Sequence, residues 1–236
     1  RVPKAPTSDG QFGNAIHETL ESLQHALKRT GELPDTEHAI AIFSTKLKAK
    51  KLSDAEFERM EGRGAQALRH FLPWWWHNFT PEAHAEYNFR HEGSFVGDAH
   101  LTGNLDQLLI DKESKTIRII DFKTGKPHAR WTRDVKSHKY KQQLIFYKLL
   151  TENSHSFKGY EVNEAALVFV EPDPVTGTMH ELPIVFSQEE IARTKQLVTA
   201  VWRCISALDL PDTTQFSADI KGILEFEDWL ITNKSM

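Results

Sequence analysis

The segment from Thr102 to Gly125 constrains the fold of this chain more than any other, because it reads as two strands joined by a short polar turn. It runs TGNLDQLLID, then KESK, then TIRIIDFKTG. Both arms are rich in β-branched and aliphatic residues, which favour strands. If Asp111 and Thr116 close the turn, the antiparallel register places Asp106 directly opposite Asp121. The segment therefore predicts a hairpin with two carboxylates facing each other.

The two aspartates also share their side of the hairpin with a lysine. Side chains alternate along a strand, so Asp121 and Lys123 lie on one face and Asp106 on the matching face of the partner arm. Like charges directly opposite each other destabilise a strand pair. A divalent cation is the simplest means of neutralising them, and hard oxygen ligands suit Mg²⁺ or Mn²⁺. The alternative interpretation is an ordinary surface salt bridge, since short Asp-x-Lys patterns are common.

Composition places the chain among ordinary globular proteins, with 39% hydrophobic and 26% charged residues in 236. The single cysteine, Cys204, lies in an apolar run and is predicted to be buried. One cysteine excludes an intramolecular disulfide and an iron–sulfur cluster built from this chain alone. No stretch approaches the roughly 18 apolar residues of a membrane span, and no secretory signal is present. We therefore expect a cytoplasmic protein with no membrane partner.

Positive charge is concentrated near the acidic pair, although the net charge of the chain is −4. Between Lys112 and Lys148 there are eleven lysines and arginines against three acidic residues. A phosphate-rich ligand lying near the two aspartates would explain this stretch. A solvated helix and loop would explain it equally well.

Hydrophobic periodicity predicts helices, in residue numbers, within 11–29, 36–50, 53–71, 135–151, 188–208 and 217–232. Strand-like segments are 82–92, 94–110, the second hairpin arm, 165–170 and 178–186. This order indicates a mixed α/β fold, most simply one sheet with helices on its faces. We expect a single domain over 1–236, with an N-terminal helical part (1–80), a sheet-bearing core (81–186) and C-terminal helices (187–236). The run Trp74–Trp76 is predicted to pack against the sheet, with base stacking or domain docking as alternatives.

Two helices carry polar residues beside an apolar stripe. His17 adjoins such a stripe, and Gly13 lies one turn earlier, where it allows close approach of another group. A lone histidine at such a position is either structural or a ligand. Gln143 and Tyr147 lie one turn apart with Lys139 on the same face. These three side chains are able to contact phosphates or bases, or they form the polar half of an amphipathic helix.

Taken together, four motifs in order resemble the RecB-family nucleases of the PD-(D/E)xK superfamily. They are Gly13-Asn-Ala-Ile-His17, Gly103-Asn-Leu-Asp106, Asp121-Phe-Lys-Thr-Gly125 and the pair Gln143 and Tyr147. Some relatives bind an iron–sulfur cluster through four cysteines, which this chain lacks, so it is similar to the cluster-free branch.

The resemblance implies an α-β-β-β-α core like that of restriction endonucleases, here a central mixed sheet flanked by helices with an N-terminal helical region. It also implies the roles of the residues at the site. Asp106, Asp121 and Lys123 would be catalytic, with Lys123 beside the attacking water. The expected metal ligands are His17, Asp106, Asp121 and the backbone carbonyl of Phe122. Glu86 would be an additional acid, and Gln143, Tyr147 and Lys139 would hold the DNA strand.

The activity implied is Mg²⁺-dependent hydrolysis of DNA, with Mn²⁺ as a substitute. The substrate would be single-stranded DNA, or ends opened by a helicase in the same polypeptide or complex during repair or recombination. The first residue is Arg1 rather than methionine, which is compatible with a piece of a longer polypeptide. The competing class is a noncatalytic DNA-binding or scaffolding module, against which the presence of Asp106, Asp121 and Lys123 argues. RNA and branched DNA are alternative substrates.

Overall fold

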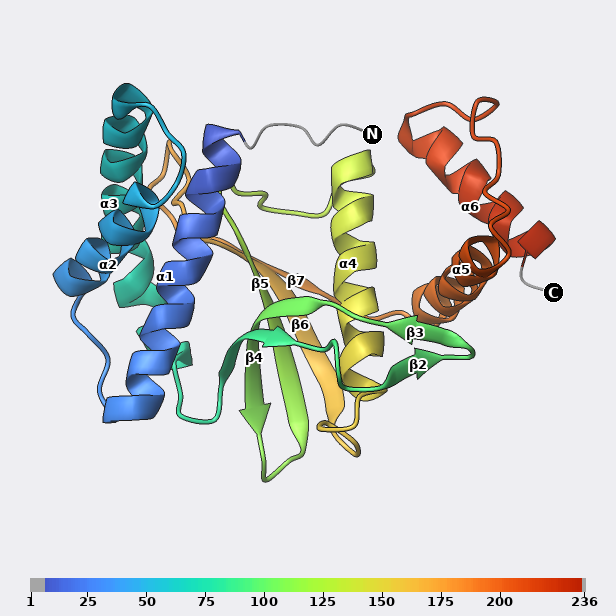
Figure 1. Ribbon diagram of the computed structural model, residues 1–236, viewed down its shortest axis with the longest axis horizontal. Helices are drawn as coiled ribbons and strands as arrows, with labels where there is room; N and C mark the ends of the chain where they lie inside the picture. The colour runs from blue at the N-terminus through green and yellow to red at the C-terminus, as the bar shows by residue number, and fades with distance from the viewer. Residues whose placement is uncertain (1–6, 235–236) are drawn as a thin grey trace.

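The computed structural model describes residues 7–234, and Figure 1 shows the arrangement of their helices and strands. In chain order these are α1 (Ser8–Thr30), α2 (Thr36–Lys48), α3 (Asp54–Trp75), the short 3₁₀ helix η1 (Trp76–Asn78), β1 (His84–Asn88), β2 (Ser94–Val96), β3 (Ala99–Leu101), β4 (Asn104–Asp111), β5 (Thr116–Lys123), α4 (Val135–Glu152), β6 (Glu161–Phe169), β7 (Glu181–Ile184), α5 (Gln188–Ser206) and α6 (Ile220–Lys234).

The central sheet has five strands in the order β1-β4-β5-β6-β7. Strands β5 and β6 are parallel, with α4 between them in the chain, and the other neighbours are antiparallel. The hairpin of β4 and β5 has the predicted register, from Asp111 opposite Thr116 to Gln107 opposite Ile120. That register ends one residue before Asp106 and Asp121. The mixed sheet flanked by helices confirms the predicted restriction-endonuclease-like fold class.

Helices cover both faces of the sheet (Figure 1). On one face, Phe12 of α1 and Phe71 of α3 belong to the same buried cluster as Phe122 of β5. On the other, Leu144 of α4 is buried in a cluster with Ile119 of β5. Each such fully buried side chain stabilises the fold by roughly 1.5–3 kcal/mol. The ends of β4 and β5 are therefore held between α1 and α4.

The N-terminal helices follow the sequence signals closely. Ser53 and Glu56 form a capping box at the start of α3, within one residue of the predicted start of this helix. The helix does not end near Phe71 as predicted, but continues through Pro73 to Trp75. Proline removes one backbone donor, yet the ring of Trp75, 1% exposed, stacks on Phe71 at 5.8 Å. This packing outweighs the missing hydrogen bond and confirms that the tryptophan run is buried at its centre.

The predicted continuous strand over 94–110 is wrong. The structure contains a separate two-stranded hairpin, β2–β3, and β4 begins only at Asn104. The break occurs at Gly97, whose φ of 58° lies in the left-handed region that glycine adopts without strain. Gly97 and Asp98 form the two-residue turn between Val96 and Ala99. In Figure 1 this hairpin projects past α4 toward α5.

The C-terminal helices α5 and α6 pack on each other beyond α4 (Figure 1). Their contact includes Cys204 and Leu230, and the predicted burial of the cysteine is confirmed. Across the part of the chain from residue 7 to residue 234, no helix has both the length and the apolar character needed to cross a membrane.

Candidate metal centre

The fold brings His17 of α1 together with two acidic residues of neighbouring strands. Nδ1 of His17 lies 3.3 Å from Oε1 of Glu86 on β1 and 3.3 Å from Oδ1 of Asp106 on β4. One potential ligand atom from each of the three residues lies within 4.8 Å of the others. All three side chains are partly shielded from solvent. This set of one nitrogen and two carboxylates is of the kind that binds divalent cations.

Asp121 lies beside this cluster rather than within it. Its side chain is only 2% exposed, and Oδ2 lies 2.5 Å from Nζ of Lys123. Apart from this ion pair, Oδ2 has no hydrogen-bond partner within residues 7–234. Burial and, next to it, the negative charge of Asp106 raise the pKa of Asp121, and Lys123 partly offsets both, so that the pKa is about 6. The two predicted acids therefore repel each other across the strand ends.

Asp106 is anchored to the strand that carries Asp121. Its Oδ2 accepts a hydrogen bond from the backbone N–H of Phe122 at 2.7 Å. In an extended strand the N–H and C=O of one residue point to the same side. The carbonyl of Phe122, a predicted ligand, therefore faces the side on which Asp106 lies.

His17 is held as a cation by its neighbours. Burial alone would lower the pKa of its imidazole, but the contacts with Asp106 and Glu86 outweigh burial and raise that pKa to about 10. The ring also packs edge-on against Phe122, with centroids 6.3 Å apart. A metal ligand must be a neutral imidazole, so a cation entering the cluster displaces this proton.

Glu86 occupies the cluster through a strained backbone. Its φ is 45°, in the left-handed region that residues with a side chain rarely adopt. Such strain costs on the order of 1–3 kcal/mol and persists where the surroundings impose it, commonly at functional sites. The surroundings of Glu86, the predicted additional acid, thus hold it next to His17 in spite of this strain.

Helix α4 supplies the opposite wall of the site. Nζ of Lys123 donates to Oε1 of Gln143 at 3.2 Å, and Nε2 of Gln143 donates to the hydroxyl of Tyr147 at 2.7 Å. Burial raises the pKa of Tyr147, and the charge of Asp121 raises it further. Lys139 is exposed and has no ion pair in the described part of the chain. The sequence reasoning missed Tyr140, whose ring lies 4.7 Å from Nζ of Lys123, although its position three residues before Gln143 on the helix indicated it.

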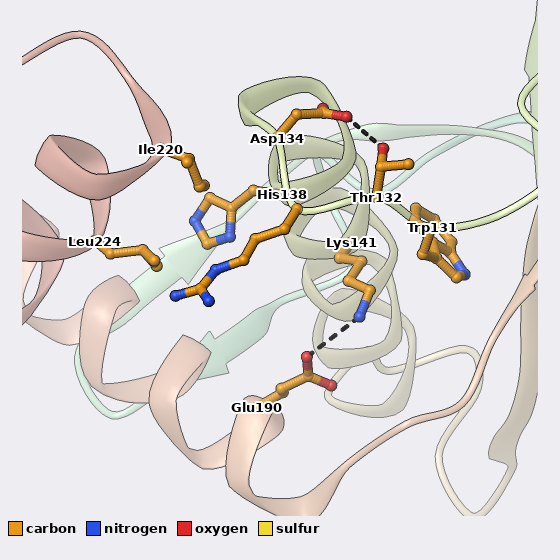
Figure 2. Close-up of a pocket in the computed structure, with 9 residues that line it drawn as sticks. Trp131, Thr132, Asp134, His138, Lys141, Glu190, Ile220 and Leu224 are labelled. Atoms are coloured by element: carbon orange, nitrogen blue, oxygen red, sulfur yellow. Dashed lines mark hydrogen bonds and ion pairs between the residues drawn. The ribbon is translucent and has the colours of Figure 1, made fainter.

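The predicted basic stretch divides into two groups. Lys141 pairs with Glu190, and two further members, Arg118 and Lys148, pair with glutamates elsewhere. Figure 2 shows the pocket beside Lys141, between α4, α5 and α6, where Arg133 and Lys141 are balanced by Asp134 and Glu190. This pocket therefore has no excess of positive charge.

Of the other basic side chains, Lys123 pairs with Asp121, and Lys112 and Lys115 lie in the turn between β4 and β5. Five more belong to the loop after β5 and to the start of α4. They are Lys126, Arg130, Arg133, Lys136 and Lys139, for which no ion pair occurs within residues 7–234. This smaller group follows Lys123 directly in the chain. These five residues are therefore the members of the basic stretch that we consider for phosphate binding.

The mixed sheet and the cluster of acids, histidine and lysine at its strand ends define the class of protein, a restriction-endonuclease-like fold with a candidate metal site. Residues 1–218 match the PD-(D/E)XK nuclease superfamily. The chain therefore belongs to that superfamily, whose members are typically nucleases that use divalent metal ions. A search of curated proteins gave no match to the chain.

Proposed function

We propose that this protein is a Mg²⁺-dependent deoxyribonuclease of the cluster-free RecB branch, which hydrolyses phosphodiester bonds. The observation that carries the proposal is the meeting of Asp106, Asp121 and Lys123 at the ends of two adjacent strands. Superfamily membership supports metal-dependent nuclease chemistry. The carboxylates of Asp106 and Asp121 repel each other, and a bound cation would neutralise part of their charge.

The residues present fit a bound Mg²⁺, or Mn²⁺ in its place. The ligands would be His17, Asp106, Asp121 and the carbonyl of Phe122, with Glu86 as an additional acid. Oδ2 of Asp121 is buried and has no partner other than Lys123 within residues 7–234, so it would be able to serve as an oxygen ligand. When bound, the ion would lower the pKa of a water molecule and neutralise charge on the phosphodiester.

The protein's own side chains would orient the reaction. Lys123, held between Asp121 and Gln143, presents a fixed positive charge where negative charge develops on the phosphate. Gln143 and Tyr147 would position the DNA strand along α4. Lys139 is exposed one turn earlier and would contact a neighbouring phosphate.

The proposed substrate is single-stranded DNA, or a duplex end that a helicase has opened. The helicase would belong to the same polypeptide or complex, and the setting would be DNA repair or recombination. Support for this finer assignment comes from the four ordered motifs of the RecB-type pattern. Digestion of labelled linear, circular, single-stranded and RNA substrates in parallel will test it, because preferential cleavage of RNA or of closed circles would contradict it.

The central experiment compares Asp121→Asn with Glu113→Gln. Both changes remove one carboxylate charge from the same hairpin, but Glu113 lies in the exposed turn. Asp121→Asn should lower Mg²⁺-dependent cleavage by more than about a hundredfold, because a metal-site ligand is lost, while Glu113→Gln should cleave like the wild type. Unaltered cleavage by Asp121→Asn would remove the proposed site, whereas absence of Mg²⁺-dependent cleavage by the wild type would leave a noncatalytic DNA-binding module.

A further inference from the structure

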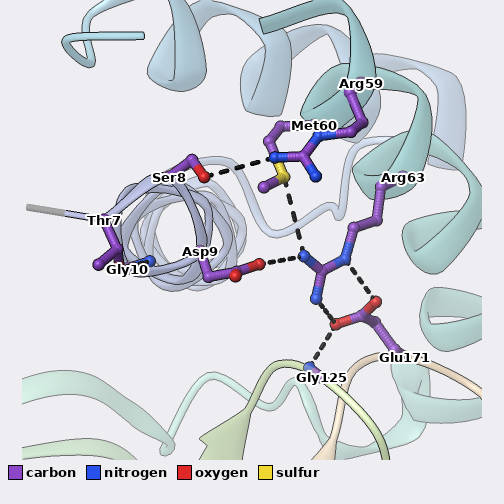
Figure 3. A network of polar contacts seen from close by, with 9 residues as sticks. All are labelled: Thr7, Ser8, Asp9, Gly10, Arg59, Met60, Arg63, Gly125 and Glu171. Carbon is purple, nitrogen blue, oxygen red and sulfur yellow. Dashed lines mark hydrogen bonds and ion pairs between the residues drawn. The ribbon is translucent and has the colours of Figure 1, made fainter. Parts of the chain in front are cut away.

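The loop that follows β5 is tied to a residue outside the candidate metal centre. Gly125, the last residue of the Asp-x-Lys-Thr-Gly motif, donates its backbone N–H to Oε1 of Glu171, which lies just after β6 (Figure 3). Gly125 has a φ of 96°, which glycine adopts far more readily than other residues. The turn that ends the motif thus depends on one side chain far along the chain.

Arg63 of α3 fixes that side chain from the other side. Its Nε and one terminal nitrogen donate to the two carboxylate oxygens of Glu171, both at 2.7 Å. The other terminal nitrogen donates to Oδ1 of Asp9 on α1 at 2.6 Å. The guanidinium also lies 4.2 Å from the ring centroid of Phe12. A bidentate arginine–carboxylate pair is among the most geometrically specific polar contacts, so the position of Glu171 is closely defined.

Helix α1 holds the same loop from a second direction. A Cβ placed on Gly13 would lie 3.2 Å from Oγ1 of Thr124, so the backbone of α1 lies close to the Thr124 side chain. His17 follows Gly13 by one helical turn. Thr124 and Gly125 are therefore held between the helix that carries His17 and the Arg63–Glu171 pair. Lys123 immediately precedes them.

We propose that Glu171, held by Arg63, is a positioning residue that fixes the end of β5 so that Lys123 keeps its contacts with Asp121 and Gln143. The inference rests on the proposed nuclease function. Within residues 7–234, Glu171 forms no hydrogen bond or ion pair with any of the predicted metal ligands. Its effect passes through the backbone of Gly125, and displacement of a catalytic group by about 1 Å costs up to about a hundredfold in rate.

The test compares Glu171→Ala, Glu171→Gln and Glu37→Ala. The last is a matched control, because Glu37 also forms a bidentate pair with an arginine of α3, Arg69, at 2.9 and 3.1 Å. That pair is exposed and does not touch the loop. Glu171→Ala should lower kcat at least about tenfold with KM and DNA affinity unchanged. Glu171→Gln should lose less, because its amide oxygen still accepts the Gly125 N–H, and Glu37→Ala should keep the wild-type kcat.

Melting temperatures separate positioning from folding. Both Glu171 variants lose the charged pair with Arg63, so a merely structural role would lower their kcat equally and in step with stability. That result would overturn the inference, as would a wild-type kcat in Glu171→Ala. A difference in kcat between two variants of similar melting temperature supports it.

Amide hydrogen exchange supplies a readout that needs neither DNA nor metal. The N–H of Gly125 should exchange slowly in the wild type and in Glu37→Ala, and faster in Glu171→Ala. Unchanged exchange in Glu171→Ala would overturn the inference whether or not the protein cleaves DNA. Conversely, absence of cleavage by the wild type would remove the proposed function while the tie between Gly125 and Glu171 still stood.

Discussion

Oδ2 of Asp106 and the backbone N–H of Phe122 are joined by a hydrogen bond of 2.7 Å, which anchors the acid of β4 to the strand that carries the second acid. Asp106 therefore cannot swing away from Asp121 without breaking a partly buried hydrogen bond. The pairing of β4 with β5 therefore keeps the charge of Asp106 close to Asp121, where it raises the pKa of Asp121. A bound cation would relieve this repulsion, which makes metal binding measurable as stability.

Added Mg²⁺ should raise the melting temperature of the wild type, because a ligand that binds only the folded state stabilises it. Asp121→Asn should lose this increment. Without Mg²⁺ the same variant should be more stable than the wild type by roughly 2 kcal/mol, since a buried charge near Asp106 is removed. Differential scanning calorimetry with and without Mg²⁺ measures both effects.

The control for this experiment is Glu113→Gln, in the exposed turn of the same hairpin. It should show the wild-type response to Mg²⁺. An equal increment in Asp121→Asn and Glu113→Gln would mean that the ion stabilises the protein at another place.

Gln143→Leu should lower kcat about tenfold without weakening DNA binding. The amide accepts from Lys123 and donates to Tyr147, so leucine leaves the ammonium without one of its two orienting partners. Single-turnover cleavage at saturating DNA measures the effect.

Lys139→Ala should give the opposite pattern. Loss of one phosphate contact should weaken DNA binding and reduce the slope of log K against log salt concentration by about one, while kcat stays constant. The reverse pattern would contradict the roles given to both residues.

Local sequence patterns were sufficient to predict much of the fold. Alternation and a polar turn were sufficient to predict the register of β4 and β5, because a slip of one residue would expose a buried face. The same reasoning failed at β2–β3, where apolar residues continue on both sides of Gly97 and Asp98. A glycine–aspartate pair between such runs is a recognised hairpin signal, so this break was readable from the sequence.

Other features were beyond local reasoning. Glu171 and Arg63 are 108 residues apart, and the residues around either one give no indication that the two side chains meet. The basic stretch looked uniform, but the fold turns Lys148 inward to Glu152 and leaves Lys139 exposed. The strained backbone of Glu86 likewise results from its surroundings. Such contacts depend on how distant segments pack, which residue spacing does not report.

Gly13→Ala should lower kcat severalfold while the melting temperature stays equal or rises. Alanine is favoured over glycine within a helix by about 1 kcal/mol, but its Cβ would press on Oγ1 of Thr124 at 3.2 Å. The matched control is Gly62→Ala on α3, where a Cβ would meet nothing within 4 Å. That variant should gain stability and keep its wild-type rate. Equal rates in the two variants would show that the approach of Thr124 to α1 is unimportant for activity.

Acid should loosen the C-terminal helices through Glu227. This buried carboxylate accepts from His138 at 2.7 Å, Gln142 at 2.7 Å and Arg193 at 3.2 Å, which joins α6 to α4 and α5. Burial alone would raise its pKa, but these contacts outweigh burial and hold the pKa below the usual 4.5. Because the folded pKa is the lower one, this stabilisation is complete well above pH 4.5 and is lost as the pH falls through the folded value.

Glu227→Gln should therefore cost about 2 kcal/mol at pH 7, where charge-assisted hydrogen bonds are lost, and the cost should shrink as the pH falls toward 3. The control is Glu225→Gln on the same helix, whose exposed carboxylate lies 3.7 Å from Lys221. Exposed pairs contribute little, so its melting temperature should follow the wild type at every pH. Urea unfolding of the three proteins between pH 3 and pH 7 measures the difference. A pH-independent cost in Glu227→Gln would show that shape rather than charge holds α6 in place.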